Sequence, residues 1–281
     1  MFLSVDFEDF SHDLRRNLGL WKTGPLNSDA LWRSYNRINN FINKNNQVKN
    51  KSITFFCTAV IAEKEPKLIR QMALDGHEVA CHYFFHDNMV NQSTTEVRKM
   101  LELSKDTLKS ASGQNIVGFR APNFNINKTS REQYQIVEEL FEYDSSFYCS
   151  DTTDLEAFKS KMRLSTLKIF PIFSKKIFGV NLRLGGSFLK IFPETYIKTM
   201  AQLAVKNGIE PHIYMHPYEF GNAESSRIKK VELSALGFNK SLYWALRQYQ
   251  WLSLGNESVE RKLSSLISAY QLNGPLKEHL L

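Results

Sequence analysis

Short apolar runs that end in polar residues alternate along the chain with longer segments of helical periodicity. The apolar runs predict buried strands, at residues 2–7, 52–59, 78–82, 116–122 and 209–220. Apolar spacing and capping residues predict helices, at residues 28–46, 66–76, 93–112, 131–141 and 195–208. A strand followed by a helix, several times over, is typical of an α/β barrel, whose site lies at the C-terminal ends of the strands.

The chain shows no internal repeat and no low-complexity linker. Its 281 residues and 42% apolar content suit a barrel with a sizeable core. Residues 239–273 have the spacing of two helices and are rich in Trp, Tyr and Leu. We therefore predict a barrel over residues 1–238 and a helical C-terminal extension over 239–281 that packs on it.

The first residues of the chain and its cysteines indicate the cellular compartment that we expect for the protein. MFLSVDFEDF lacks the basic segment and apolar run of a secretory signal, and no run approaches the roughly 18 apolar residues of a membrane span. Three cysteines without metal-type spacing fit a reducing compartment better than a disulfide scaffold. We predict a cytoplasmic protein that can also work at the inner membrane face.

Positive charge is concentrated in one stretch. The net charge is +7, yet residues 157–193 hold eight basic and no acidic residues, so the remainder has 28 basic against 29 acidic residues, a balance of −1. The eight are Lys159, Lys161, Arg163, Lys168, Lys175, Lys176, Arg183 and Lys190. Such a stretch can contact phosphates or an anionic membrane, or can simply be a solvated face. We find no stacking motif or base-reading module and predict no nucleic-acid partner.

Polar groups cluster where the predicted strands end. They are Asp6-Phe7-Glu8-Asp9, His82-x-x-x-His86, Arg120-Ala121-Pro122, Asp144 and His216-Pro217. Each group alone has an ordinary structural explanation, such as a helix face or a buried histidine. Together, two imidazoles and a carboxylate can form a three-ligand divalent metal site. A second carboxylate can then act as a base and a further histidine as an acid, while the arginine keeps the base ionised.

Five short segments resemble the motifs of the polysaccharide deacetylases, carbohydrate esterase family 4. They are SVDFED, DGHEVACHYFFH, GFRAPNF, YDSS and YMHPYEF, in the family's order and spacing between residues 2 and 220. The branch that they resemble most is tied to exopolysaccharide and lipopolysaccharide assembly. The resemblance implies an α/β fold, the distorted (β/α) barrel of the NodB-homology type with about seven strands.

The resemblance also implies a role for individual residues. It makes His82 and His86 metal ligands, Asp6 the catalytic base and His216 the catalytic acid. Arg120 would orient Asp6, and Asp144 would hold Arg120. The backbone N–H of Asn123 would be an oxyanion-hole donor. His77 matches a position outside the metal triad, and we expect it to be structural.

The third metal ligand departs from the family pattern of two adjacent aspartates, because position 7 is Phe. Strand alternation places residues 6 and 8 on one face. We therefore favour Glu8 as the ligand beside Asp6, with Asp9 as the second choice. Zn²⁺ is the default metal for a His₂-carboxylate set, although Co²⁺, Ni²⁺, Mn²⁺ and Fe²⁺ accept similar ligands.

The leading hypothesis is a metal-dependent hydrolase that removes the N-acetyl group of an amino sugar or a sugar-linked precursor in surface polysaccharide biosynthesis. The expected substrate is nucleotide- or lipid-linked, with peripheral membrane contact through residues 157–193. Two alternatives stay open: a metal-independent hydrolase of cyclic amides, as in the allantoinase-like relatives, and a barrel that has lost catalysis and binds glycan. The intact polar set argues against the last.

Overall fold

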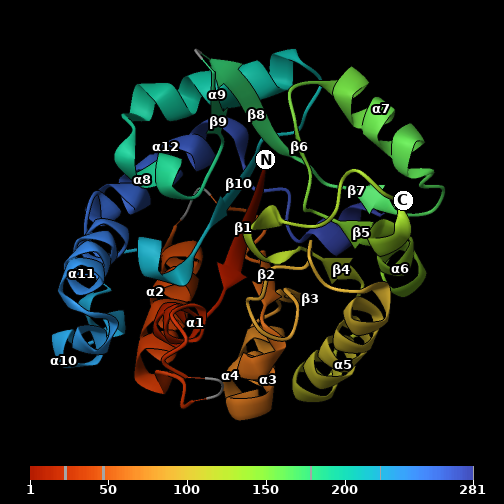
Figure 1. Cartoon of the computed structure of the whole chain (residues 1–281). Helices are drawn as coiled ribbons and strands as arrows, with labels where there is room; N and C mark the ends of the chain where they lie inside the picture. The colour runs from red at the N-terminus through yellow and green to blue at the C-terminus, as the bar shows by residue number, and fades with distance from the viewer. Residues whose placement is uncertain (22–23, 46–47, 178, 222, 281) are drawn as a thin grey trace.

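Seven parallel strands form one curled sheet at the centre of the molecule (Figure 1). The computed structural model describes residues 1–21, 24–45, 48–177, 179–221 and 223–280. In spatial order the strands are β10 His212–Met215, β1 Phe2–Phe7, β2 Thr54–Cys57, β3 Glu78–Cys81, β4 Gly118–Phe119, β5 Tyr143–Asp144 and β7 Lys168–Ile169. The predicted distorted (β/α) barrel with about seven strands is confirmed.

Helices cover the outside of this sheet (Figure 1). They are α1 Phe10–Asn17, α2 Ser28–Lys44, α3 Ala59–Lys64, α4 Pro66–Leu74, α5 Thr94–Ser112, α6 Glu132–Leu140, α7 Thr152–Met162, α8 Ser187–Ile191, α9 Glu194–Lys206, α10 Lys230–Leu233, α11 Phe238–Leu252 and α12 Val259–Tyr270. Local capping explains why the longer ones were predictable. Ser93 accepts a hydrogen bond at the start of α5, and Gly113 ends that helix in the left-handed conformation.

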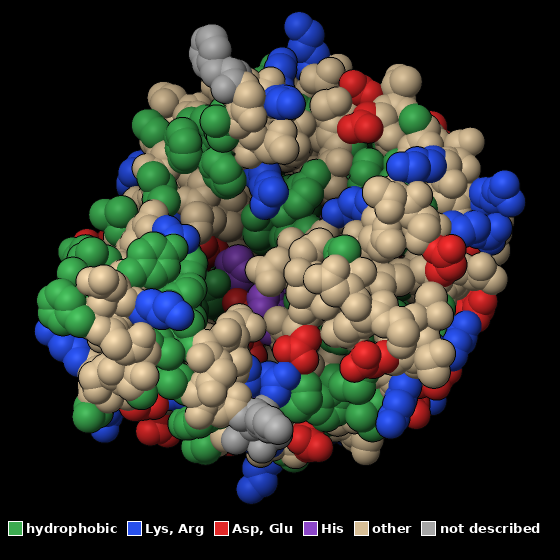
Figure 2. Space-filling model, viewed as in Figure 1, with side chains coloured by type: hydrophobic (Ala, Val, Ile, Leu, Met, Phe, Trp, Pro, Cys, Tyr) green, Lys and Arg blue, Asp and Glu red, His purple; other side chains and the backbone are tan. Residues whose placement is uncertain are grey.

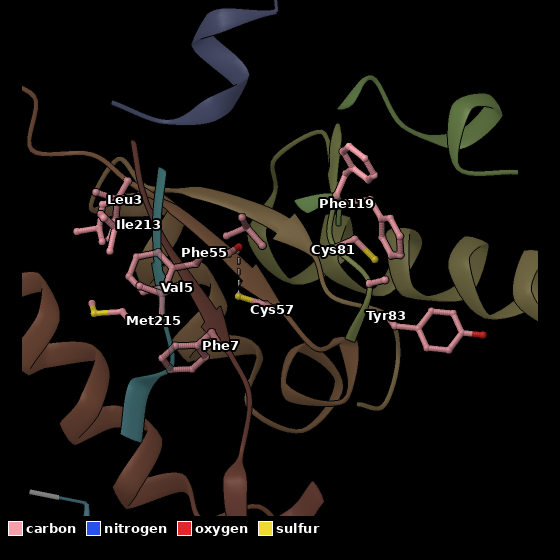
Figure 3. Packing of buried hydrophobic residues seen from close by; sticks show 14 of the residues in the cluster. Leu3, Val5, Phe7, Phe55, Cys57, Cys81, Tyr83, Phe119, Ile213 and Met215 are labelled. Atoms are coloured by element: carbon pink, nitrogen blue, oxygen red, sulfur yellow. Dashed lines mark hydrogen bonds between the residues drawn. The ribbon is translucent and has the colours of Figure 1, made fainter. Parts of the chain in front are cut away.

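The two faces of β1 have different environments because side chains alternate along a strand. Its odd-numbered residues pack with residues of β10 and β2 in the layer between sheet and helices (Figure 3): Leu3, Val5, Phe7, Phe55, Ile213 and Met215. The even-numbered Ser4 and Asp6 are also buried, and both bond Arg120 inside the barrel. The apolar side holds the fold together, and the polar side builds the site.

A second small sheet lies beside the gap between β7 and β10. It contains β6 Tyr148–Cys149, β8 Ile172–Ile177 and β9 Val180–Arg183, in the order β6-β8-β9. A bridge between Gly185 and Tyr214 joins the end of this segment to β10. The basic stretch 157–193 therefore includes the seventh barrel strand and a hairpin, and its cations are spread over five elements. The side chain of Lys190 is buried.

The C-terminal segment packs on the barrel as two helices followed by a short 3₁₀ turn, η6 Leu276–His279. The two predicted helices are confirmed, while the division at residue 238 stays a prediction. The N-terminus contacts this segment: the Met1 ammonium donates to the Gln271 carbonyl at 2.9 Å. Among the described residues, no helix is long and apolar enough to cross a membrane.

Candidate metal centre and active site

Glu8, His82 and His86 converge at the C-terminal ends of β1 and β3. One ligand atom from each lies within 4.8 Å of the other two. Glu8 follows the last residue of β1, His82 follows β3, and all three side chains have little contact with solvent. The separation and the ligand types fit a single divalent ion held by two imidazoles and a carboxylate.

A hydrogen bond determines which nitrogen His82 presents to this centre. Its Nδ1 lies 2.8 Å from the carbonyl oxygen of Arg120, so Nδ1 carries the proton and donates it. The opposite nitrogen, Nε2, is buried and has no hydrogen-bond partner. Burial lowers the pKa of His82 to about 4, which keeps the ring neutral. An unpartnered lone pair on a neutral imidazole is what a metal ligand requires.

The loop after β3 brings the two histidines together without a helix. Tyr83 has a positive φ of 67°, an uncommon conformation for a residue with a large side chain. Its carbonyl accepts a hydrogen bond from the Ala59 N–H, at the start of α3, which holds the turn in place. The ring centroids of His82 and His86 are then 5.3 Å apart.

Asp9, the second choice for the third ligand, is engaged elsewhere. Its carboxylate caps α1 by accepting from the Ser11 and His12 N–H groups at 2.9 and 3.1 Å. The other carboxylate oxygen accepts from the Asn27 N–H at 2.5 Å. A carboxylate that satisfies three backbone donors is poorly placed to bind a metal as well, so the structure favours Glu8.

Glu8 and His86 form a buried ion pair, with 2.7 Å between Oε2 and Nε2. Burial alone would raise the pKa of Glu8, but the charge and hydrogen bond of His86, together with smaller contributions from His216 and His82, lower it to about 2. Burial would lower the pKa of His86, but the Glu8 carboxylate raises it to about 9. The other Glu8 oxygen accepts from the Tyr218 hydroxyl at 3.2 Å. The carboxylate is thus ionised and oriented towards the centre.

Asp6 lies beside this triad and is paired with Arg120. The Arg120 Nη1 donates to Asp6 Oδ1 at 2.5 Å, and both side chains are excluded from solvent. The Asp6 charge offsets part of the lowering of the His82 pKa that burial causes. A permanent cation in contact with a buried carboxylate favours the ionised form that a base needs.

The prediction that Asp144 holds Arg120 is wrong. The Asp144 carboxylate accepts from the N–H and hydroxyl of Ser146, at 2.9 and 2.5 Å, in a tight turn after β5. Arg120 donates instead to the carbonyl and hydroxyl of Ser145, at 3.1 and 2.7 Å. Strand alternation explains the difference, since adjacent residues at a strand end point to opposite sides. Burial raises the pKa of Asp144 to about 6, and the Arg120 charge only partly offsets this.

Two further groups that the sequence did not identify complete the Arg120 site. Ser4 accepts from Arg120 Nη1 at 2.9 Å, and His212 Nε2 lies 3.3 Å from Nη2. Burial and the arginine charge lower the pKa of His212 well below its usual value, so it stays neutral and can accept. Ser4 is two residues before Asp6, and this spacing was the one signal available for it.

His216, at the end of β10, is held by a carboxylate that was also not foreseen. The His216 Nδ1 lies 2.9 Å from Glu219 Oε2, and that oxygen also accepts the His216 N–H at 3.0 Å. Burial would lower the pKa of His216, but the Glu219 charge outweighs it and raises the pKa to about 9. Its Nε2 faces Glu8 at 4.0 Å. The ring is therefore protonated and directed at the centre, as an acid should be.

A pocket of about 270 Å³ opens above these groups. Figure 2 shows histidine side chains at the bottom of a hollow near the middle of this face. The walls include Asn123, whose backbone is left-handed with φ 53°, and Trp244 and Trp251 of α11. Asp13 also lines it and was not predicted; burial raises the pKa of this carboxyl to about 6. A larger hollow, about 800 Å³ between α2 and α12, lies away from the site.

His77 is structural, as expected. The imidazole is fully buried, accepts from the Ile53 N–H at 3.3 Å, and donates through Nε2 to Asn39 at 3.1 Å. It joins β2, α2 and the turn before β3 and has no contact with the metal centre.

Two family models match the chain. Residues 29–138 match the family model of polysaccharide deacetylases. This match covers less than half of the chain. Residues 140–272 match a second family, described only as a domain of unknown function. His82, His86 and Arg120 fall in the first match, and His216 falls in the second.

A curated relative resembles the chain over part of its length. A chitooligosaccharide deacetylase from Azorhizobium caulinodans is 34% identical over 70 residues, which are 25% of this chain and 33% of that protein. The chain thus spans about a third of the curated relative that it matches.

Solved structures show the same fold. The match to a structure from Mycobacterium smegmatis, described as a putative polysaccharide deacetylase, covers 97% of this chain and 92% of that protein. The identity is 16% and the TM-score is 0.52. The match to a carbohydrate esterase family 4 pseudoenzyme from Bacillus anthracis covers 100% of this chain and 64% of that protein, with 14% identity and a TM-score of 0.50. At these identities the likeness concerns the fold alone.

Proposed function

We propose that the protein is a metal-dependent hydrolase that removes the N-acetyl group from an amino sugar. The observation that carries this proposal is the convergence of Glu8, His82 and His86 within 4.8 Å, with an unpartnered His82 Nε2. The residues fit a divalent ion, for which Zn²⁺ is the default. When bound, the ion would polarise the acetamide carbonyl and lower the pKa of a water in the site.

The chain's own groups supply the proton transfers. Asp6, paired with Arg120, takes the proton of the attacking water. His216, protonated because Glu219 raises its pKa to about 9, gives a proton to the departing amine nitrogen. The backbone N–H of Asn123, at the pocket wall, donates to the developing oxyanion.

We further propose an N-acetylated sugar of surface polysaccharide biosynthesis as the substrate, carried on a nucleotide or a lipid. The chitooligosaccharide deacetylase match supports the N-acetyl sugar. A cytoplasmic location is supported by three buried cysteines, all of them free thiols: Cys57, Cys81 and Cys149. Lys168, Lys175 and Lys176 of the basic stretch are our candidates for guiding a phosphate-bearing carrier, and the two in β8, Lys175 and Lys176, are exposed.

The test combines metal analysis with acetate release. Freshly purified protein is assayed for bound metal and for acetate released from chitooligosaccharides and from nucleotide-linked N-acetyl sugars. We expect about one metal per chain and acetate release in the wild type, and loss of both in His82→Ala. His279→Ala, a histidine at the far end of the barrel, is the matched control and should keep both.

The same assay separates the two other hypotheses. Acetate release without metal, or ring opening of a cyclic amide in the presence of a chelator, would favour the metal-independent hydrolase. Bound metal with no turnover of any substrate would favour a glycan-binding barrel. The complete set of Asp6, His216 and metal ligands argues for turnover.

A further inference from the structure

Helix α11 has apolar side chains on two opposite faces. Its inner face packs on the barrel through Leu252, which is buried, and through Trp244 and Trp251. Its outer face carries four large apolar residues at intervals of four, four and three, which is helical spacing. They are exposed to unusual degrees: Phe238 83%, Leu242 53%, Leu246 62% and Tyr249 55%.

We call these four residues, together with Val231 of the adjoining α10, the outer patch. Val231 is 74% exposed, and α10 contacts α11. A surface helix normally buries one apolar stripe and presents a polar one. Isolated exposed apolar residues are common on protein surfaces, but a contiguous row of them marks a surface that binds a membrane or another molecule. Figure 2 shows apolar side chains gathered on the left, over α8 and α11, beside the hollow of the site.

The charge around the outer patch points to the occupant. Residues 224–254 hold five basic and two acidic residues, a net +3 out of +7 for the whole chain. One of the two acids, Glu232, is already paired with Arg15 at 2.7 and 2.8 Å. Helix α11 itself contains no Asp or Glu. Arg227 lies 5.9 Å from the Tyr249 ring, and Lys229 and Lys230 are exposed at the start of α10.

We propose that the outer patch docks on an anionic lipid surface. Leucine and aromatic side chains flanked by cations, with no acids on the helix, are what an interfacial helix needs to insert into the headgroup region of anionic lipids. A second copy of the chain fits less well, since a symmetric contact would bring the same cations together. The patch differs from the basic stretch 157–193, whose cations are spread over five elements.

Docking would place the pocket near the lipid surface. Trp244 and Trp251 line the pocket from the inner face of α11, while the outer patch lies across the same helix. A helix is about 10 Å in diameter with its side chains, so the two are separated by roughly that distance. Resting on the proposed function, this geometry suits an N-acetylated sugar attached to a membrane lipid, delivered at the interface.

The test is sedimentation with vesicles, using the full chain. We expect binding to vesicles of phosphatidylglycerol and phosphatidylcholine, much weaker binding to phosphatidylcholine alone, and a loss as salt rises. The double variant Leu242→Ser, Leu246→Ser should bind about tenfold or more weakly. The matched control is Leu74→Ser, Val205→Ser, which removes exposed apolar residues of α4 and α9 and should bind like wild type.

Acetate release from a water-soluble chitooligosaccharide should be equal in all these variants, so a failure of docking is distinguishable from a failure of the proposed function. Wild-type protein that does not bind anionic vesicles would overturn the proposal. So would a concentration-dependent dimer, seen by analytical ultracentrifugation, that the Leu242→Ser, Leu246→Ser variant abolishes, because the patch would then be an interface between copies. Equal vesicle binding by both double variants would show that the outer patch is not the docking surface.

Discussion

Two neighbouring carboxylates, Glu8 and Asp9, take opposite roles because the chain turns between them. Glu8 still points to the barrel interior, where His86 and Tyr218 hold it. Asp9 is already the N-cap of α1 and accepts from backbone donors. Because position 7 is Phe, the carboxylate that faces the two histidines is Glu8. The next acid, Asp9, caps the helix that begins at Phe10.

The first prediction separates these roles. Glu8→Gln should lose metal, because a neutral amide cannot replace the carboxylate in the triad. Asp9→Ala should retain metal but lose the cap, which lowers the free energy of unfolding by about 1–2 kcal/mol. Elemental analysis and urea denaturation measure the two effects. Loss of metal in Asp9→Ala with retention in Glu8→Gln would reverse the assignment.

The second prediction concerns metal binding and pH. In the metal-free protein the Glu8 charge raises the pKa of His86 to about 9, whereas Glu8 and His82 are already deprotonated at neutral pH. Binding must therefore displace one proton from His86. Below pH 9 the apparent affinity should rise with pH, by roughly tenfold per unit between pH 6 and 8.

Titration calorimetry in two buffers of different ionisation enthalpy measures this proton release directly. An affinity that does not change over that range, or an enthalpy independent of the buffer, would contradict the prediction.

At the scale of elements, β10 and the short 3₁₀ turn η2 Pro217–Glu219 form one unit. The turn returns Glu219 to the backbone N–H and ring of His216. The third prediction is that Glu219→Gln lowers the pKa of His216 by about one unit or more, because the carboxylate that favours the imidazolium is gone. The protonated ring is the acid, so activity is lost as pH rises, and the alkaline limb of the kcat profile should move to lower pH.

Nuclear magnetic resonance titration of His216 supplies the independent readout for this variant. An unchanged pKa with a reduced kcat would mean that Glu219 only shapes the turn. Glu224→Gln, an exposed glutamate in the following turn, is the control and should leave both quantities as in the wild type.

Arg120 ties three strands together from inside the barrel. It follows β4 and donates to Asp6 in β1 and to Ser145 after β5. The fourth prediction is that Arg120→Ala lowers the free energy of unfolding by roughly 3–5 kcal/mol, since Asp6 would keep a buried charge without a partner. Asp6→Asn, Arg120→Ala should recover part of this loss, as measured by urea denaturation. No recovery in the double variant would show that Arg120 stabilises the barrel mainly by packing.

At the scale of the whole molecule, the C-terminal tail closes the bottom of the barrel. The Leu276 N–H donates to Thr54 Oγ1 at 2.9 Å, and the Lys277 N–H donates to Glu78 Oε2 at 3.1 Å. Glu78 is buried, with the Tyr143 hydroxyl as a further donor. The tail therefore satisfies polar groups at the N-terminal ends of β2 and β3, opposite the site.

The fifth prediction is that a chain ending at Asn273 loses several kcal/mol of unfolding free energy, because those buried groups lose their donors. Leu276→Ala keeps the backbone donors and should cost about 2–5 kcal/mol through the cavity alone. If the shortened chain is as stable as the wild type in urea, the tail does not close the barrel.

Much of the barrel was predictable, because its strands and long helices depend on local patterns. Residues 28–46 were predicted as a helix, and α2 spans Ser28–Lys44. The strands within residues 157–193 were not predicted from the sequence, because β7 has only two residues and β8 carries lysines on its exposed end. Strands this short are specified by neighbouring strands rather than by their own pattern.

The sequence by itself determined which polar residues end the strands, and hence that Asp6, Glu8, His82, Arg120 and His216 would meet at one edge. Only the tertiary structure decided their partners. Adjacent residues at a strand end diverge, so Ser145 rather than Asp144 bonds Arg120. The free lone pair of His82 likewise depends on a carbonyl 38 residues away in sequence. Hydrogen bonds need atoms within about 3 Å, and that distance is set by the packing of strands that no local pattern encodes.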